Sequence, residues 1–319
     1  MAKQIKPIFI FSMPRSGSTL LQKMLVSHPK ISSHGETWLL LPFVYAIKRE
    51  GIITEYNECT GQNAISEFIS HLPNKEKDYY EELGKFALKL YQKHSNNEMY
   101  FIDKTPRYYY IIPEITKMFP NAKFIFLFRN PLDILSSIIN TWRKGKFRLA
   151  SFVDDIWKAP LLLVREYRAL KNKCISVNYE ALISKPENEL EKICSHLNLE
   201  FTKEMIDVSS KPKIQGSLGD KNVKNYESIS TKSVDRWCDT LNTKYRIKFA
   251  KRWLNFIGNK NLKTMGYDKK NLFKQLNLKS TLPGIWDAFN YYISIIKLKG
   301  KLFLKVTRQK KFMAFLKNK

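Results

Sequence analysis

The stretch that decides the fold is Pro7-Ile-Phe-Ile-Phe-Ser-Met-Pro-Arg-Ser-Gly-Ser-Thr-Leu-Leu21, near the start of the sequence. Its first part, Pro7–Ser12, is an apolar run of Ile and Phe, which is typical of a β-strand buried on both faces. A short loop of small residues follows, and the apolar spacing of Leu20–Leu25 predicts a helix after it. A buried strand that leads through a tight loop into a helix indicates an α/β fold.

The same alternation of strands and helices continues along the chain. We predict further strands at Met99–Asp103, Lys123–Phe128 and Cys174–Asn178. Helices are predicted at Glu36–Lys48, Asp78–His94, Tyr109–Phe119, Leu132–Thr141, Phe152–Leu170, Glu187–Leu197 and Thr243–Ile257. Because right-handed crossovers through helices join parallel strands, the sequence predicts a P-loop-like, three-layer α/β/α fold with a central parallel sheet. We assign residues 1–270 to this domain and residues 271–319 to a basic amphipathic C-terminal extension.

The composition is that of a globular chain without disulfides. The 319 residues are 44% hydrophobic and 13% aromatic, which excludes disordered and collagen-like classes. Four scattered cysteines, none at C-x-x-C spacing, argue against a disulfide framework or a zinc ribbon, so we expect reduced thiols and no metal. The sequence shows neither a signal-peptide pattern nor 18 uninterrupted apolar residues, so we expect a cytoplasmic protein.

The charge is the unusual part of the composition. Lys and Arg number 55 against 29 Asp and Glu, and the formal net charge of +26 indicates a polyanionic partner. Residues 283–319 hold nine Lys and Arg and one acid, and a helix there would align an apolar stripe of Trp286, Phe289, Ile293 and Ile296. This segment either lies on an anionic membrane surface, as a peripheral attachment, or docks on the domain with its charges solvated. Nucleic acid is not expected, because no recognised binding module is present.

The loop between the first strand and its helix has the features of an anion site. A helix N-terminus offers unpaired backbone N–H groups and the positive end of the helix dipole. Arg15 adds a fixed charge, and small residues let a phosphate approach the backbone: Ser16, Gly17, Ser18 and Thr19. The alternative is an ordinary glycine-containing turn. Ser18 stands where nucleoside triphosphatases have a lysine, so we predict a phosphate site but not an ATP or GTP hydrolase.

Two motifs together resemble those of a known family. Pro14-Arg-Ser-Gly-Ser-Thr-Leu-Leu21 resembles the 5′-phosphosulfate loop of sulfotransferases that use 3′-phosphoadenosine 5′-phosphosulfate (PAPS), in particular the tyrosylprotein and related carbohydrate sulfotransferases. Arg129 at the end of a strand, with Ser137 eight residues later, is similar to the second motif of that family. The resemblance implies that Arg129 and Ser137 hold the 3′-phosphate of the donor. Open α/β sheets bind ligands at this edge. The alternative is a surface salt bridge from Arg129 to Asp133.

Glu36, in the motif H-G-E-T, is the leading candidate for the base that takes the acceptor's proton. It lies 21 residues after Arg15, and the resemblance implies a glutamate at this distance. The tyrosylprotein enzymes read G-E-E-T followed by Arg, so Gly35 and Trp38 change the expected acceptor contacts but not the base. Two alternatives stay open: Glu36 is a first-turn acid of the following helix, or His34 is the base.

Further candidates follow the later strands. Lys104, in Ile102-Asp-Lys-Thr-Pro106, comes at the end of a buried strand, and the resemblance implies that it contacts the sulfuryl group or the bridging oxygen. The alternative is a plain surface lysine. Tyr179 lies in a segment that resembles the family pattern V-x-Y-E-x-L, which makes it a candidate adenine contact. The late polar loop Gly219-Asp-Lys-Asn222 resembles the C-terminal basic loop of the family, and the resemblance implies that Lys221 and Lys224 contact the 3′-phosphate.

Together the motifs predict a sulfotransferase that moves a sulfuryl group from PAPS to an acceptor hydroxyl by in-line transfer, without a metal. Glu36 would be the base, Lys104 and Arg15 would act on the transferring group, and residues 16–19 would bind the 5′-phosphate. The acceptor would be a glycan, a lipid-linked sugar or a small alcohol. Two alternatives stay open: a small-molecule or nucleoside kinase with a degenerate phosphate loop, and a non-enzymatic protein that binds a polyanion or a membrane surface.

Overall fold

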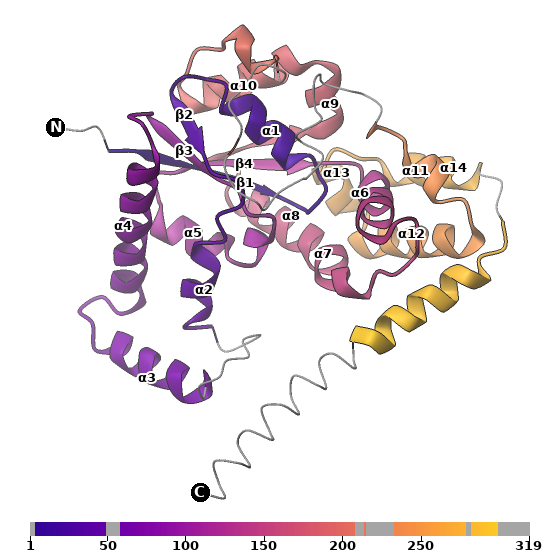
Figure 1. Ribbon diagram of the computed structural model, residues 1–319, viewed down its shortest axis with the longest axis horizontal. Coiled ribbons are helices and arrows are strands. Elements are labelled where there is room, and N and C mark those ends of the chain that lie inside the picture. The colour runs from indigo at the N-terminus through magenta and orange to yellow at the C-terminus, as the bar shows by residue number, and fades with distance from the viewer. Residues whose placement is uncertain (1–3, 49–57, 208–213, 215–232, 279–281, 299–319) are drawn as a thin grey trace, which may run out of the picture. The chain divides into compact units, whose positions relative to one another are not determined.

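A computed structural model describes residues 4–48, 58–207, 214, 233–278 and 282–298 of the chain (Figure 1). The chain divides into two compact units. The first unit comprises Met1–Asn130 and Ala159–Ser233, and the second comprises Pro131–Lys158 and Val234–Lys319. The predicted division at residue 270 stays a prediction, and Lys221 and Lys224 lie outside the described residues. In the described ranges, no helix combines the length and the apolar character that crossing a bilayer requires.

The first unit is built on a parallel sheet of five strands in the order β2-β3-β1-β4-β5. Their bounds are Lys6–Ser12 for β1, Ile31–Ser33 for β2, Tyr100–Asp103 for β3, Lys123–Phe128 for β4 and Cys174–Asn178 for β5. The central strand β1 is apolar on both faces because both are covered, and Ile8 and Phe9 are fully buried. The predicted α/β class and parallel sheet are confirmed.

Helices cover both faces of this sheet. Figure 1 shows α1, α9 and α10 on one face and α4, α5 and α8 on the other, which makes the three layers. The helices of the first unit are α1 Ser18–Leu25, α2 Leu40–Tyr45, α3 Glu58–Ser70, α4 Glu76–His94, α5 Ile112–Met118, α8 Ala159–Ala169, α9 Tyr179–Ser184 and α10 Pro186–Leu197. Because all five strands run parallel, their carboxyl ends meet at one edge, where ligands bind in such sheets.

The described part of the second unit is helical. Its elements are α6 Pro131–Ser137, a π-helical turn at Ile138–Trp142, α7 Val153–Trp157, α11 Trp237–Thr240, α12 Lys244–Ile257, α13 Asn259–Thr264, α14 Lys269–Asn277 and a further helix at residues 285–298. Two buried tryptophans form hydrogen bonds between helices of this unit, one between α12 and α7 and one between α11 and α6. The Trp253 indole N–H donates to the Ile156 carbonyl at 2.7 Å, and the Trp237 backbone N–H donates to Asp133 at 3.2 Å.

Two predicted helices are wrong in extent, for backbone reasons. The helix predicted at Glu36–Lys48 is confined to α2, because Trp38 adopts a left-handed φ of 53°, which a right-handed helix cannot contain. The helix predicted at Phe152–Leu170 is interrupted at Lys158, just before Pro160, whose ring removes a hydrogen bond donor from the helix. As a result Glu36 lies on a loop and not in a first helical turn.

Candidate active site

The loop between β1 and α1 has the backbone that the sequence predicted. Arg15 and Gly17 take left-handed φ values of 69° and 88°, which turn the chain sharply into the start of α1. The side-chain hydroxyls of Ser12 and Ser16 are buried and have no hydrogen bond partner. A buried polar group without a partner costs roughly 1–3 kcal/mol, so two such groups in one loop indicate a ligand that accepts hydrogen bonds.

Tyr179 packs against this loop from the start of α9. A Cβ atom at Gly17 would lie 2.2 Å from Cε2 of the Tyr179 ring, and the φ of 88° is itself unfavourable for other residues. The Tyr179 hydroxyl lies 2.8 Å from the Ser233 hydroxyl. Glycine is therefore required at position 17 both by the turn and by the aromatic ring above it.

Arg129, at the end of β4, is only 7% exposed and ties the loop to neighbouring segments. Its terminal nitrogens donate to the carbonyl oxygens of Arg15 at 2.9 Å and Ser233 at 2.7 Å. Its Nε atom is buried without a partner, and its guanidinium carbon lies 4.4 Å from the centre of the Tyr179 ring. Within the described residues this buried cation donates hydrogen bonds only to carbonyl groups, and it is well suited to an anion, because burying a charge is costly unless it is paired.

Asp133, the predicted alternative partner of Arg129, belongs to the second unit, whereas Arg129 belongs to the first, so this alternative stays a prediction. The Asp133 carboxylate is buried at the start of α6 and accepts the backbone N–H groups of Asp235 at 3.1 Å and Trp237 at 3.2 Å. Ser137 is the last residue of α6, in the second unit. Its role at the 3′-phosphate therefore stays a prediction.

Glu36 and Lys104 meet at the carboxyl edge of the sheet. Lys104 follows β3 and is 1% exposed, so the surface-lysine alternative is wrong. Its Nζ atom donates to Glu36 Oε1 at 3.2 Å and to Thr19 Oγ1, at the start of α1, at 3.4 Å. The other carboxylate oxygen, Glu36 Oε2, accepts the indole N–H of Trp38 at 3.2 Å. Lys104 thus links the predicted base to the loop that is predicted to hold a phosphate.

A buried carboxylate supports this arrangement. Asp103, next to Lys104, accepts hydrogen bonds from the hydroxyls of Thr37 at 2.7 Å, Tyr91 at 2.6 Å and Tyr108 at 2.9 Å. Burial raises the pKa of Asp103, while the three hydroxyl donors oppose that shift. Because Thr37 directly follows Glu36, this network holds the Glu36 loop against the end of β3.

The sequence signal for this support was incomplete. An acid at the end of a buried strand, as Asp103 is, needs hydrogen bond donors, but nothing local in the sequence predicts its three hydroxyl partners. Ser233 was also missed, because it follows a polar stretch without a motif.

Comparisons with known proteins bear on this site. The model of the sulfotransferase family matches residues 7–203, more than half of the chain. The chain belongs to the sulfotransferase family. The nodulation protein NoeE of Sinorhizobium fredii is 24% identical over 301 residues, which cover 84% of this chain and 68% of that protein. Protein-tyrosine sulfotransferase 1 of Danio rerio is 24% identical over 261 residues, covering 80% of this chain and 67% of that protein.

Solved structures support the fold of this sulfotransferase. The sulfotransferase domain of the Synechococcus PCC 7002 olefin synthase is 23% identical, with a TM-score of 0.54 over 78% of this chain and 96% of that domain. The predicted resemblance is confirmed, and the chain is a sulfotransferase. The kinase and the non-enzymatic binding protein are therefore set aside.

His34, the alternative base of this sulfotransferase, has a different neighbour. Its Nδ1 atom lies 3.1 Å from Nε2 of His94, at the end of α4. Burial and the nearby His94 lower the pKa of His34. Its backbone carbonyl accepts a hydrogen bond from Gln22 at 2.8 Å. Of the two candidate bases, Glu36 is thus the one that contacts the buried Lys104.

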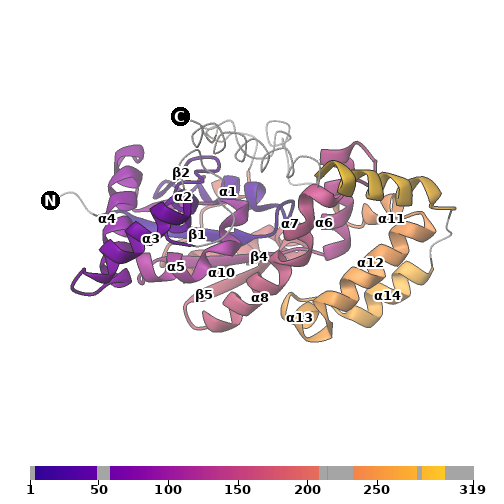
Figure 2. The ribbon, with the colours of Figure 1, turned by 90° about the horizontal axis from the view of Figure 1, so that it is seen from below.

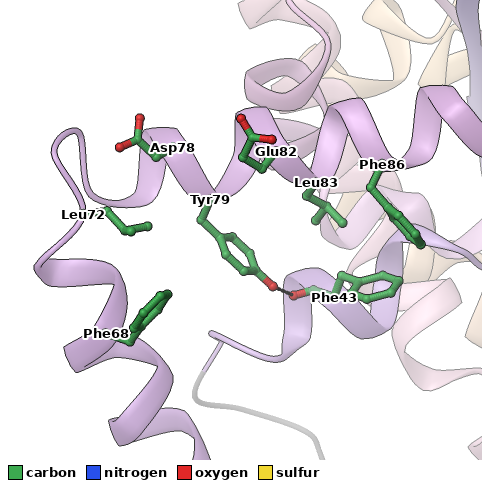
Figure 3. Close-up of a pocket in the computed structure, with 8 residues that line it drawn as sticks. All are labelled: Phe43, Phe68, Leu72, Asp78, Tyr79, Glu82, Leu83 and Phe86. Carbon is green, nitrogen blue, oxygen red and sulfur yellow. Dashed lines mark hydrogen bonds between the residues drawn. The ribbon is translucent and has the colours of Figure 1, made fainter.

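The first unit also contains an apolar pocket of about 430 Å³ between α2, α3 and α4 (Figure 3). Figure 3 shows the Tyr79 hydroxyl reaching the backbone carbonyl of Phe43, at 2.9 Å. The pocket is lined by Phe43, Phe68, Leu72, Asp78, Tyr79, Glu82, Leu83 and Phe86. None of the predicted donor or catalytic residues is among them, so the pocket is a feature apart from the candidate site. Within the described ranges, no group of three or more His, Cys, Asp or Glu is arranged to hold a metal.

Proposed function

We propose that this sulfotransferase moves a sulfuryl group from PAPS to an acceptor hydroxyl, with Glu36 as the base. The observation that carries the proposal is the position of Lys104 Nζ, 3.2 Å from Glu36 Oε1 and 3.4 Å from Thr19 Oγ1. One buried ammonium group therefore contacts both the residue proposed to act on the acceptor and the loop proposed to hold the donor.

The loop residues suit the anionic end of the donor. Ser16, Gly17, Ser18 and Thr19 would hold the 5′-phosphate with backbone N–H and hydroxyl groups, and Arg15 would add charge. The unpartnered hydroxyls of Ser12 and Ser16 support this assignment.

The residues around Arg129 suit the other end of the donor. Arg129 and Ser137 would hold the 3′-phosphate, and the unpartnered Nε of Arg129 supports that role. Tyr179 would contact the adenine, next to the guanidinium that its ring already meets at 4.4 Å.

The transfer forms a bond between the acceptor oxygen and sulfur and breaks the bond between sulfur and the bridging phosphate oxygen. Glu36 takes the proton of the acceptor hydroxyl, which makes that oxygen a better nucleophile. Lys104 and Arg15 stabilise the negative charge that grows on the departing phosphate. The Trp38 indole N–H orients the Glu36 carboxylate through its second oxygen, at 3.2 Å.

The acceptor we propose is a hydroxyl on a glycan, a lipid-linked sugar or a small alcohol. Gly35 and Trp38 stand where the tyrosylprotein enzymes have an acid and an arginine. Trp38 contacts Glu36 through an uncharged indole N–H, where an arginine would place a positive charge. Without that charge, this side of the site favours an acceptor that carries no acidic groups. Labelled PAPS offered with each acceptor class and with a tyrosine peptide tests the choice, and preferred transfer to the peptide would overturn it.

A ligand-binding experiment tests the donor assignment before the acceptor is known. We expect adenosine 3′,5′-bisphosphate to raise the unfolding temperature of the protein, because a ligand that binds only the folded state stabilises it. ATP with magnesium should raise it less, and an oligonucleotide should not raise it. Stabilisation by ATP with magnesium, but not by the bisphosphate, would overturn the proposed donor.

A further inference from the structure

The helix at residues 285–298, yellow in Figure 2, is part of the second unit and is held there by polar side chains. Asp287 is 6% exposed and accepts two hydrogen bonds from the guanidinium of Arg246, at 2.8 and 3.0 Å. A third, from Thr243 Oγ1, measures 2.6 Å. One turn along the helix, Asn290 accepts from Arg148 at 3.0 Å. On the same side, the Tyr291 ring packs against the rings of Phe147 and Phe249. The docked side of this helix is thus mainly polar, with one aromatic ring.

The apolar side of the same helix faces away from these contacts. Its exposed fractions are 78% for Ile285, 76% for Trp286, 54% for Phe289, 61% for Tyr292 and 68% for Ile296. Positions three to four residues apart share one helix face, so these side chains form a continuous stripe. Apart from the packed Tyr291 ring, this distribution is the reverse of that of an ordinary surface helix, which buries its apolar side. An exposed apolar stripe of this size marks an interaction surface.

The sequence that follows the stripe indicates what would cover it. Residues 297–319 contain nine Lys and Arg and no acid. Basic residues next to an apolar, aromatic-rich helix face match the surface of an anionic bilayer, which offers apolar depth and negative charge together. Trp and Tyr are suited to that boundary because each has an apolar ring and a polar atom.

A second copy of this chain fits the stripe less well. Two copies meeting through this face would bring together two segments that each carry nine positive charges and no negative ones. Like charges that approach in this way repel each other. We propose that the apolar face of the helix at residues 285–298 holds the enzyme on an anionic membrane, and that the positive charge of the sequence from residue 297 onward strengthens this attachment. This inference is independent of the donor site and of the proposed acceptor.

Vesicle co-sedimentation of the full chain tests the proposal. We expect the protein to bind vesicles of phosphatidylcholine mixed with phosphatidylserine, to bind phosphatidylcholine vesicles weakly, and to be released by high salt. The double variant Trp286→Ser/Phe289→Ser should lower the partition coefficient by about 10-fold or more, because two large apolar groups are lost from the contact. The single variant Ile296→Ser, at the other end of the stripe, should lower it by a smaller factor.

A matched control is available in the first unit. Phe68, on α3, is 68% exposed, so Phe68→Ser removes a comparable exposed aromatic and should leave vesicle binding unchanged. Equal binding to both vesicle types, or equal binding by the wild type and the double variant, would overturn the proposal. So would light scattering that shows a dimer which the double variant converts to a monomer. Stabilisation by adenosine 3′,5′-bisphosphate, measured on the same samples, reports on the donor site separately.

Discussion

The site at the sheet edge and the helix at residues 285–298 depart from ordinary burial in opposite ways. At the site, polar groups are buried without partners, namely the hydroxyls of Ser12 and Ser16 and the Nε of Arg129. On the helix, large apolar groups such as Trp286 are exposed without cover. The first kind of surface favours an anion that accepts hydrogen bonds, and the second favours an apolar medium. The unpaired polar groups and the exposed apolar groups therefore indicate the chemistry of the ligand or surface that each region would bind.

The two regions also use positive charge differently. At the site, Lys104 and Arg129 are buried at fixed positions, where they can distinguish one ligand geometry from another. From the last turn of the helix onward, the positive charges of residues 297–319 are many and close together in sequence. Binding to a membrane surface with many negative groups does not require positive charges at fixed positions, so a basic segment is sufficient for it. Variants that remove single groups should therefore affect the two regions to very different degrees.

The largest effect is expected from Glu36→Gln. Turnover should fall by about 100-fold or more, because an amide cannot accept the acceptor's proton. Stabilisation by adenosine 3′,5′-bisphosphate should remain. The measurement is turnover at saturating labelled PAPS, with Glu82→Gln as a control on an exposed carboxylate of α4. Normal turnover in Glu36→Gln would move the base to His34 or elsewhere.

Arg129→Ala should have the next largest effect, on donor binding. The bisphosphate should bind about 10- to 100-fold more weakly, because hydrogen bonds to a charged group are lost. Arg129→Lys should not restore binding, since one ammonium group cannot replace the planar fork that reaches both Arg15 and Ser233. Arg165→Ala, whose side chain is 63% exposed, is the control. A fall in unfolding temperature with unchanged affinity would give Arg129 a structural role only.

Asp103→Asn should have a moderate effect through the position of Glu36. The amide has one acceptor oxygen in place of two, so at least one hydroxyl donor loses its acceptor. The free energy of unfolding should therefore fall by about 1–3 kcal/mol. Turnover should fall by roughly 10-fold, while the KM for the donor changes little. A loss of donor affinity as large as the loss of turnover would show that Asp103 acts on the whole fold and not on the position of Glu36.

The stability of Asp103→Asn should also depend on pH differently from that of the wild type. Because the pKa of Asp103 is raised above its ordinary value of 3.8, the folded state holds this proton more tightly than the unfolded state. Asp103 therefore favours folding most below pH 3.8, and that contribution is lost as the pH rises through the raised pKa. As the pH rises from 3.8 through the raised pKa of Asp103, the free energy of unfolding of the wild type should fall relative to that of Asp103→Asn. Denaturant unfolding of both proteins across this range measures the difference.

The smallest effect on chemistry is expected from Trp286→Ser/Phe289→Ser. With a soluble acceptor, turnover should stay within about 2-fold of the wild type, because exposed substitutions seldom disturb a fold. This result would confirm that the two regions act independently. A large loss of turnover without membranes would instead show that the stripe contributes to the catalytic unit.

Much of the fold could be predicted from local patterns. The strands at Lys123–Phe128 and Cys174–Asn178 have the predicted bounds, because apolar runs of that length are typical of buried parallel strands. The short strand Ile31–Ser33 was missed, since two of its three residues are serines at the sheet edge. The helix expected from Glu36 onward begins only at Leu40, because a left-handed residue interrupts it.

The sequence by itself determined the α/β class, the tight turn from the first strand into its helix and the resemblance to sulfotransferases, because these depend on residue types at short spacings. Only the tertiary structure decided which groups have partners. It placed Lys104 between Glu36 and Thr19, left Ser12 and Ser16 unpaired, and turned the polar side of helix 285–298 inward. The physical reason is that a local pattern sets the tendency of a side chain to be buried, whereas its partners come from segments far away in the sequence.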